Sequence, residues 1–144
     1  MREIKFRALD ENCEWIYGMP LTNVEHEDKE FPIMRNCDET GYWGIKKIHP
    51  KTLGQYTGLK DKNGAEIYEG DIVERMYIFK GEYGETHTGE VVYDKDYARY
   101  VISRPKKYIE PKTENLRNTL SDKCTYEVVG NVYENPELLE CEVE

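Results

Sequence analysis

Oxygen-bearing side chains gather in one short stretch near the middle of the chain, where Asp61, Asn63 and Glu66 surround Gly64. Carboxylate and amide oxygens are the ligands of Ca²⁺, and a calcium loop also needs a glycine for its sharp turn. In an EF-hand that glycine is the sixth residue, whereas here it is the fourth, and the other ligand positions are not spaced correctly. The same residue types build ordinary tight turns. We therefore interpret this stretch as a turn that binds no metal.

Zinc is the second metal to consider, because the chain contains three histidines and four cysteines. Structural zinc sites usually contain at least one pair of ligands close together in sequence. No such pair occurs among these residues, which lie far apart at His26, His49, His87, Cys13, Cys37, Cys124 and Cys141. We expect dispersed histidines, free thiols, no metal and no cofactor.

Paired carboxylates can perform acid–base catalysis, and Glu69 and Asp71 flank Gly70. That chemistry needs a pocket and two different pKa values, of which the sequence gives no sign. A turn or capping role suits Asp71 better, because it follows a glycine at the start of a predicted strand. No Ser-His-Asp or Cys-His arrangement and no phosphate-binding loop stands out. We predict that the protein has no catalytic residues and is not an enzyme.

Basic and aromatic side chains are interleaved in the segment 99–112 of this otherwise acidic chain. Positive side chains beside aromatic rings can follow a single strand of nucleic acid, and small barrels often serve this purpose. A solvated loop that balances an acidic protein explains the same pattern, and we favour that interpretation. The residues that would contact nucleic acid are Arg99, Tyr100, Arg104, Lys106, Lys107, Tyr108 and Lys112, with Glu110 as the opposing charge.

The composition indicates a protein with a thin, tyrosine-rich core. Of its 144 residues, 38% are hydrophobic, below the usual ~45–50%. A thin core favours oligomerisation, because a partner subunit can bury what one chain cannot. The net charge of -9 argues against a protein that coats nucleic acid through a general basic field, although it permits an acidic mimic of nucleic acid.

The start of the chain has charged residues but no apolar run behind them, so the sequence shows no secretory signal. No stretch is long and apolar enough for a transmembrane helix. We therefore expect a cytoplasmic protein that does not contact a membrane.

The elements that must position these residues are short strands joined by turns. Asn and Gly tolerate positive φ, so Asn63-Gly64 is the strongest hairpin signal in the chain, and Gly70-Asp71 marks a second break. Strands are predicted at 4–9, 15–18, 72–79, 89–93, 98–102 and 125–133, the last bent at Gly130. The predicted fold class is mainly β: a small, strongly bent, barrel-like sheet with one or two short helices.

The predicted turn residues are Asp61, Asn63, Gly64, Gly70 and Asp71. Residues 31–34 are predicted as an edge strand because of Pro32, and 80–88 as a flexible loop. Short helices are predicted at 116–120 and after Asn135, which suits an N-cap, and the tail should fray from 140. With no internal repeat or linker, residues 1–144 are expected to form a single domain.

Four stretches of the chain together resemble the YopX family of mostly phage- and prophage-encoded proteins of unknown function. They are 2–8, 55–64, 67–73 and 128–139, and they occur in the family's order and reach both ends of the chain. Leu9 is a departure, since members often have Trp there. The resemblance implies a mainly β fold and a tendency to self-associate, and it supplies no catalytic residues.

Two functional hypotheses follow, with a third further away. The first is a non-enzymatic phage or prophage accessory protein that assembles with itself and binds a protein of the host or the phage. The second is a nucleic-acid-binding module that uses the segment 99–112. The third is an acidic mimic that occupies a DNA-binding protein of the host.

Overall fold

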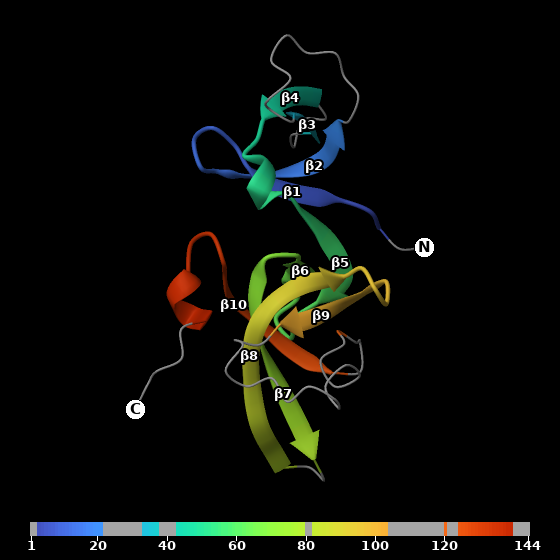
Figure 1. Ribbon diagram of the computed structural model, residues 1–144, viewed down its shortest axis with the longest axis vertical. Helices are drawn as coiled ribbons and strands as arrows, with labels where there is room; N and C mark the ends of the chain where they lie inside the picture. The colour runs from blue at the N-terminus through green and yellow to red at the C-terminus, as the bar shows by residue number, and fades with distance from the viewer. Residues whose placement is uncertain are drawn as a thin grey trace. The chain divides into compact units, whose positions relative to one another are not determined.

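The computed structural model describes residues 3–21, 33–37, 43–79, 82–103, 120 and 124–139. The described strands form two antiparallel sheets, ordered β4-β3-β2-β1-β5-β6 and β10-β7-β8-β9 (Figure 1). The predicted mainly β fold is confirmed, although these strands do not close into a barrel. In chain order the elements are β1 (Phe6–Leu9), β2 (Trp15–Leu21), β3 (Ile33–Cys37), β4 (Trp43–Lys47), η1 (Pro50–Thr52), β5 (Gly54–Lys60), β6 (Glu66–Tyr68), β7 (Asp71–Phe79), β8 (Glu82–Asp94), β9 (Arg99–Ser103), β10 (Thr125–Asn131) and η3 (Pro136–Leu139).

Contacts along the chain separate into two compact units, Met1–Tyr56 and Thr57–Glu144. The boundary falls inside strand β5, so one continuous strand belongs partly to each unit. The sequence indicates a single domain because no linker composition marks this boundary. Each unit has its own apolar cluster and is described separately below.

The first unit is built on a hairpin of β1 and β2, which correspond to the strands predicted at 4–9 and 15–18. Strands β1 and β2 pair so that Ala8 lies opposite Ile16, and both are buried together with Ile48. Phe6 and Leu53 pack against this cluster. In β2 the buried Ile16 is followed by the exposed Tyr17, as a period of two requires, whereas Arg7, Ala8 and Leu9 of β1 are all buried.

Strand β3 pairs with β2 on one side and with β4 on the other, so the predicted edge position is wrong for Ile33 and Met34, while 31–32 lie outside the described residues. The described strand begins at Ile33, immediately after Pro32, which leaves every residue of β3 with a backbone N–H for pairing. Among the described strands, β4 takes the edge position next to β3.

The second unit encloses an apolar cluster within a strongly curved sheet. Ile67, Val73, Val91, Ile102 and Tyr126 are buried there. The ribbon of β8 bends sharply along its length (Figure 1). Register irregularities occur between β10 and β7 and between β7 and β8. Such irregularities bend and twist a strand, and this accounts for the curvature.

Three further predictions can be compared with the structure. Residues 82–88, predicted as part of a loop, belong to strand β8, because they pair with β7. The predicted bend at Gly130 is confirmed by the register shift between Val128 and Gly130. The predicted helix at 116–120 lies outside the described residues except for Leu120.

The described helical elements are single turns of 3₁₀-helix, η1 and η3. The short helix predicted after Asn135 is confirmed by η3, whereas η1 was not predicted. None of the helices in the described part of the chain has the length and apolarity that crossing a membrane would require.

Candidate functional site

The predicted hairpin turn connects β5 to β6, and Asp61 organises it. Gly64 has a φ of +82°, and its N–H donates to the carbonyl oxygen of Asp61 at 3.0 Å. Oδ1 of Asp61 accepts hydrogen bonds from the N–H groups of Asn63 and Ala65, both at 2.9 Å. The other carboxylate oxygen, Oδ2, accepts from the N–H of Val128 in β10 at 3.0 Å. One side chain therefore closes the turn and attaches it to a strand far away in sequence.

These donors decide the ionisation of Asp61. Burial by itself would raise its pKa, but the hydrogen bonds from three backbone N–H groups and the nearby charge of Lys62 outweigh burial and lower the pKa from its ordinary value of 3.8. A bound cation would have to compete with these donors for the same oxygens. Among the residues that the structure describes, no group of three or more His, Cys, Asp or Glu is placed to hold a metal ion.

The hairpin loop of the first unit is built in the same way around Asp10. Its Oδ1 accepts from the N–H of Asn12 at 2.9 Å and from the N–H of Glu14 at 3.0 Å. Cys13 occupies the position that Gly64 takes in the other loop, and it has a φ of +59°. Both loops thus place an Asp first, an Asn third and a left-handed residue fourth. Cys13 is exposed and free.

The predicted break at Gly70 is a tight corner. Gly70 has a φ of +87°, its N–H donates to Val91, and its carbonyl accepts from Val132, both at 2.9 Å. A Cβ atom at this position would lie 3.0 Å from the ring of Tyr133. Positive φ and the close aromatic ring together explain the glycine.

Asp71, next to this corner, is almost fully buried at 2% exposure. Its Oδ2 accepts a hydrogen bond from the N–H of Tyr68 at 2.8 Å, and in register it lies opposite Asn131. Oδ1 of Asn131 accepts from the N–H of Tyr133 at 3.1 Å, and Oδ1 of Asn135 accepts from the N–H of Asn131 at 3.3 Å. The polar side chains of the corner thus accept hydrogen bonds from backbone N–H groups, which is a structural role.

A second cluster, which we call the tyrosine hairpin, lies where β8 turns into β9. It consists of Tyr93, Tyr97, Arg99 and Tyr100. Tyr93 lies opposite Tyr100, and their rings meet edge to face with centroids 5.3 Å apart. The guanidinium of Arg99 lies over the ring of Tyr97 at 4.8 Å, and its Nε lies 3.6 Å from Oδ2 of Asp94. Tyr93 and Tyr97 are nevertheless 49% and 65% exposed.

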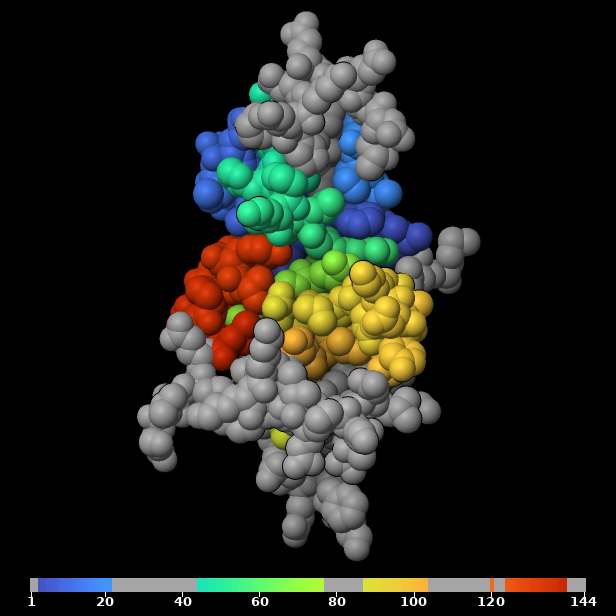
Figure 2. Space-filling view, in the orientation of Figure 1, coloured from blue at the N-terminus to red at the C-terminus, as the bar shows by residue number. Residues whose placement is uncertain are grey.

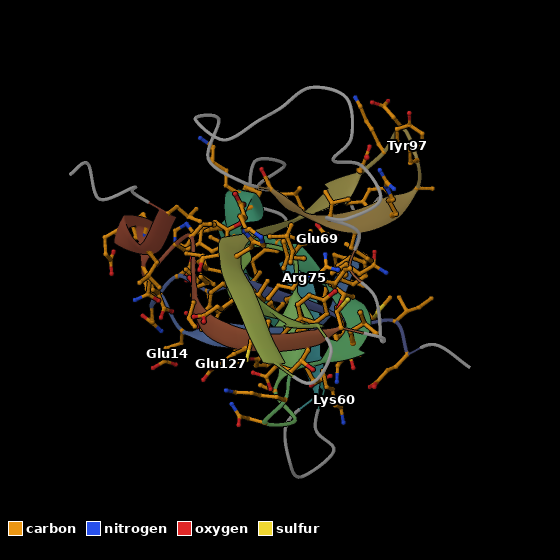
Figure 3. All side chains as sticks on the ribbon, turned by 90° about the horizontal axis from the view of Figure 1, so that it is seen from below. Glu14, Lys60, Glu69, Arg75, Tyr97 and Glu127 are labelled. Atoms are coloured by element: carbon orange, nitrogen blue, oxygen red, sulfur yellow. The ribbon has the colours of Figure 1, made fainter. Side chains whose placement is uncertain are left out.

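The tyrosine hairpin lies at the surface of its unit (Figures 2 and 3). Its residues, in yellow, form part of the surface on the face drawn in Figure 2. Tyr97 lies at the outer tip of the hairpin, whereas Arg75 lies among the strands of the same unit (Figure 3). The hairpin tip is therefore accessible to a ligand that could not reach the curved interior.

Two of the predicted nucleic-acid contacts, Arg99 and Tyr100, belong to the tyrosine hairpin. The other five, Arg104, Lys106, Lys107, Tyr108 and Lys112, lie outside the described residues. Sequence reasoning missed Tyr97 and did not assign Tyr93 to the candidate site. The available signal was the turn at Asp94-Lys-Asp96, which brings the residues on either side of it together.

The first unit carries a third feature, the outer face of its sheet, defined by Tyr17, Met19 and Ile45. These side chains are 48%, 46% and 62% exposed. Near them the guanidinium of Arg7 lies over the ring of Trp15 at 4.4 Å. Tyr17 and Met19 alternate with the buried Ile16, as a strand with one core face requires.

Comparison with known proteins supplies a family and a structural relative. The family model described as YopX protein matches residues 5–140. A solved structure, that of protein EF1440 from Enterococcus faecalis, is 28% identical in sequence, and the alignment covers 97% of this chain and 100% of that one with a TM-score of 0.50. No curated protein matches the chain.

Proposed function

The chain belongs to the YopX family, and on this premise we propose that it is a non-enzymatic protein that associates with itself and binds a protein partner. The proposal includes an origin in a phage or prophage and a place in the cytoplasm of the host cell. The family resemblance supports the first of these.

The outer face of the first unit carries the proposal of self-association. Met19 lies opposite Arg35, and Arg35 lies opposite Ile45, so Met19 and Ile45 belong to one row across three strands. Adjacent strands are about 4.8 Å apart, which places these two positions roughly 10 Å apart. Tyr17 is the next residue of β2 on the same face. Large exposed apolar groups gathered on one face are typical of an interaction surface.

A second copy of the chain is the partner that fits this face. Homo-oligomers are usually closed and symmetric, and a two-fold axis brings the same patch of both copies together. Face-to-face packing would bury Tyr17, Met19 and Ile45 of each copy, which adds apolar burial to a chain of low hydrophobic content. Lys46 and Lys47 end the neighbouring edge strand β4, and lysines at an edge discourage strand-to-strand addition. We therefore favour face-to-face packing over extension of the sheet.

The carboxylates support the non-enzymatic part of the proposal. Oxygens of Asp10, Asp61 and Asp71, all buried, accept hydrogen bonds from backbone N–H groups. A general acid or base must instead reach a reacting proton. These three carboxylates of the acidic turns are therefore engaged in holding the backbone.

Sedimentation velocity over a range of concentrations tests self-association. The wild type is expected to form a dimer or small ring at tens of micromolar, and Met19→Lys and Ile45→Lys to shift the distribution toward monomer. Val129→Lys is the matched control, because Val129 is also an exposed aliphatic residue but lies in the sheet of the second unit. A monomeric wild type, or an equal effect of the control, would contradict the proposal.

A further inference from the structure

The tyrosine hairpin exposes aromatic surface that its own unit does not use. Tyr100 packs against the apolar cluster of the second unit, and it supports Tyr93 from across the strand pair. Tyr97 instead lies beyond this support, with Arg99 on one side of its ring. Neither Tyr93 nor Tyr97 is required to fill the core, since about half or more of each side chain faces solvent.

We infer that the tyrosine hairpin is a stacking platform for single-stranded nucleic acid. Bases of an unpaired strand stack on aromatic side chains, and arginine adds a cation–π contribution to such contacts. Tyr93 and Tyr97 offer two aromatic positions on one hairpin, and Arg99 is already placed over the second ring. Tyr93 meets the ring of Tyr100 and Tyr97 meets the guanidinium of Arg99, and these contacts restrict the two rings before binding.

The charges around the hairpin limit the strength of this binding. The hairpin turn contains two acids, Asp94 and Asp96, and two bases, Lys95 and Arg99, so its formal charges cancel. The chain that follows β9 is basic, with Arg104, Lys106 and Lys107 before Glu110. A strand stacked on the hairpin would meet a neutral surface in a chain whose net charge is -9. Stacking must therefore supply the main part of the affinity, and binding should be modest and should depend little on salt.

The probe is a fluorescently labelled single strand of about 16 thymidines, the upper end of the site size for one small domain, followed by anisotropy. The double variant Tyr93→Ala/Tyr97→Ala is expected to bind at least about tenfold more weakly than the wild type. Tyr93→Phe/Tyr97→Phe retains the rings and should bind almost as well as the wild type. Tyr17→Ala changes a tyrosine on the first unit that is about as exposed as Tyr93, and it should leave binding unchanged.

A duplex of the same length separates stacking from general attraction to phosphate, because its bases are already stacked inside. Weaker binding of the duplex supports the inference. It is overturned if the single strand does not bind, if the duplex binds as well, or if the double alanine variant binds normally. It is also overturned if the triple variant Arg104→Ala/Lys106→Ala/Lys107→Ala abolishes binding while the double alanine variant does not. A double alanine variant that binds DNA normally but no longer self-associates would show that the hairpin is a protein contact.

This inference does not depend on the proposed function. Self-association is tested by substitutions at Met19 and Ile45 and read by sedimentation. Nucleic-acid binding is tested at Tyr93 and Tyr97 and read by anisotropy. Circular dichroism and the urea midpoint of each variant show whether it is folded, and these four exposed positions lie outside the buried clusters of both units.

Discussion

Asp61 and Val128 are 67 residues apart in the chain, and they are joined by a hydrogen bond of 3.0 Å from the N–H of Val128 to Oδ2 of Asp61. Close by, the N–H of Lys62 donates to the carbonyl of Tyr126 at 2.9 Å. The turn between β5 and β6 therefore covers the side of β10 that does not pair with β7. An uncovered strand edge invites pairing with other chains, so this turn protects the sheet of the second unit.

Replacing Asp61 by Asn should destabilise the protein by about 1–3 kcal/mol, because three partly buried backbone N–H groups lose a charged acceptor. The pKa of Asp61 is lowered in the folded state, so its stabilising contribution is present above the ordinary value of 3.8 and is lost as the pH falls through the folded value. Urea unfolding at neutral and acidic pH measures this. The difference between wild type and Asp61→Asn should shrink in acid, and a constant difference would contradict the assignment.

The fourth positions of the two similar hairpin loops provide a matched pair of substitutions. Gly64→Val should cost about 1–2 kcal/mol through the strained positive φ alone, because a Cβ atom there would meet nothing within 4 Å. Cys13→Gly should instead stabilise by about 0.5–1 kcal/mol, because Cys13 already has a φ of +59°. Urea midpoints that move in the same direction for both variants would show that the two loops do not share this conformation.

Gly89 is predicted to be needed for close packing between β8 and β9. A Cβ atom at this position would lie 2.4 Å from the backbone oxygen of Ser103 and 2.5 Å from Cγ2 of Ile102. Gly89→Ala should therefore destabilise by about 1–3 kcal/mol. Gly44→Ala is the control, because it is also a strand glycine and its Cβ would meet nothing within 4 Å. Thermal unfolding should show a clear loss for Gly89→Ala, and an equal change in the two melting temperatures would refute the argument.

Glu90 should oppose folding at neutral pH. Burial raises its pKa from the ordinary value of 4.5, so the folded state holds the proton more firmly than the unfolded state does. The effect of Glu90 on stability is therefore most favourable below pH 4.5. It becomes unfavourable as the pH rises through the pKa of Glu90 in the folded state. Glu90→Gln should raise the urea midpoint at neutral pH and have little effect in acid. A lower midpoint at neutral pH would show that the charged form makes a stabilising contact.

Local sequence determined the hairpins and their turns. The order Asp-Lys-Asn-Gly at 61–64 predicts both the turn and the positive φ of Gly64, because its main hydrogen bonds span four residues or fewer. The same local chemistry produced the loop at Asp10. Alternation along β1 and β2 likewise indicated which side chains, such as Ala8 and Ile16, face a core. The family and the mainly β fold could also be predicted.

Only the tertiary structure decided which strands are neighbours. The partner of Asp61 in β10, the interior position of β3 and the approach of Ser103 to Gly89 all depend on pairing between distant segments. Alternation shows that a strand has two faces, but it does not show which strand lies beside it. The exposure of Tyr93 and Tyr97 has the same origin. The sequence predicts a strand and a turn there, and the pairing of Tyr93 with Tyr100 decides that Tyr93 and Tyr97 lie at the surface of the hairpin.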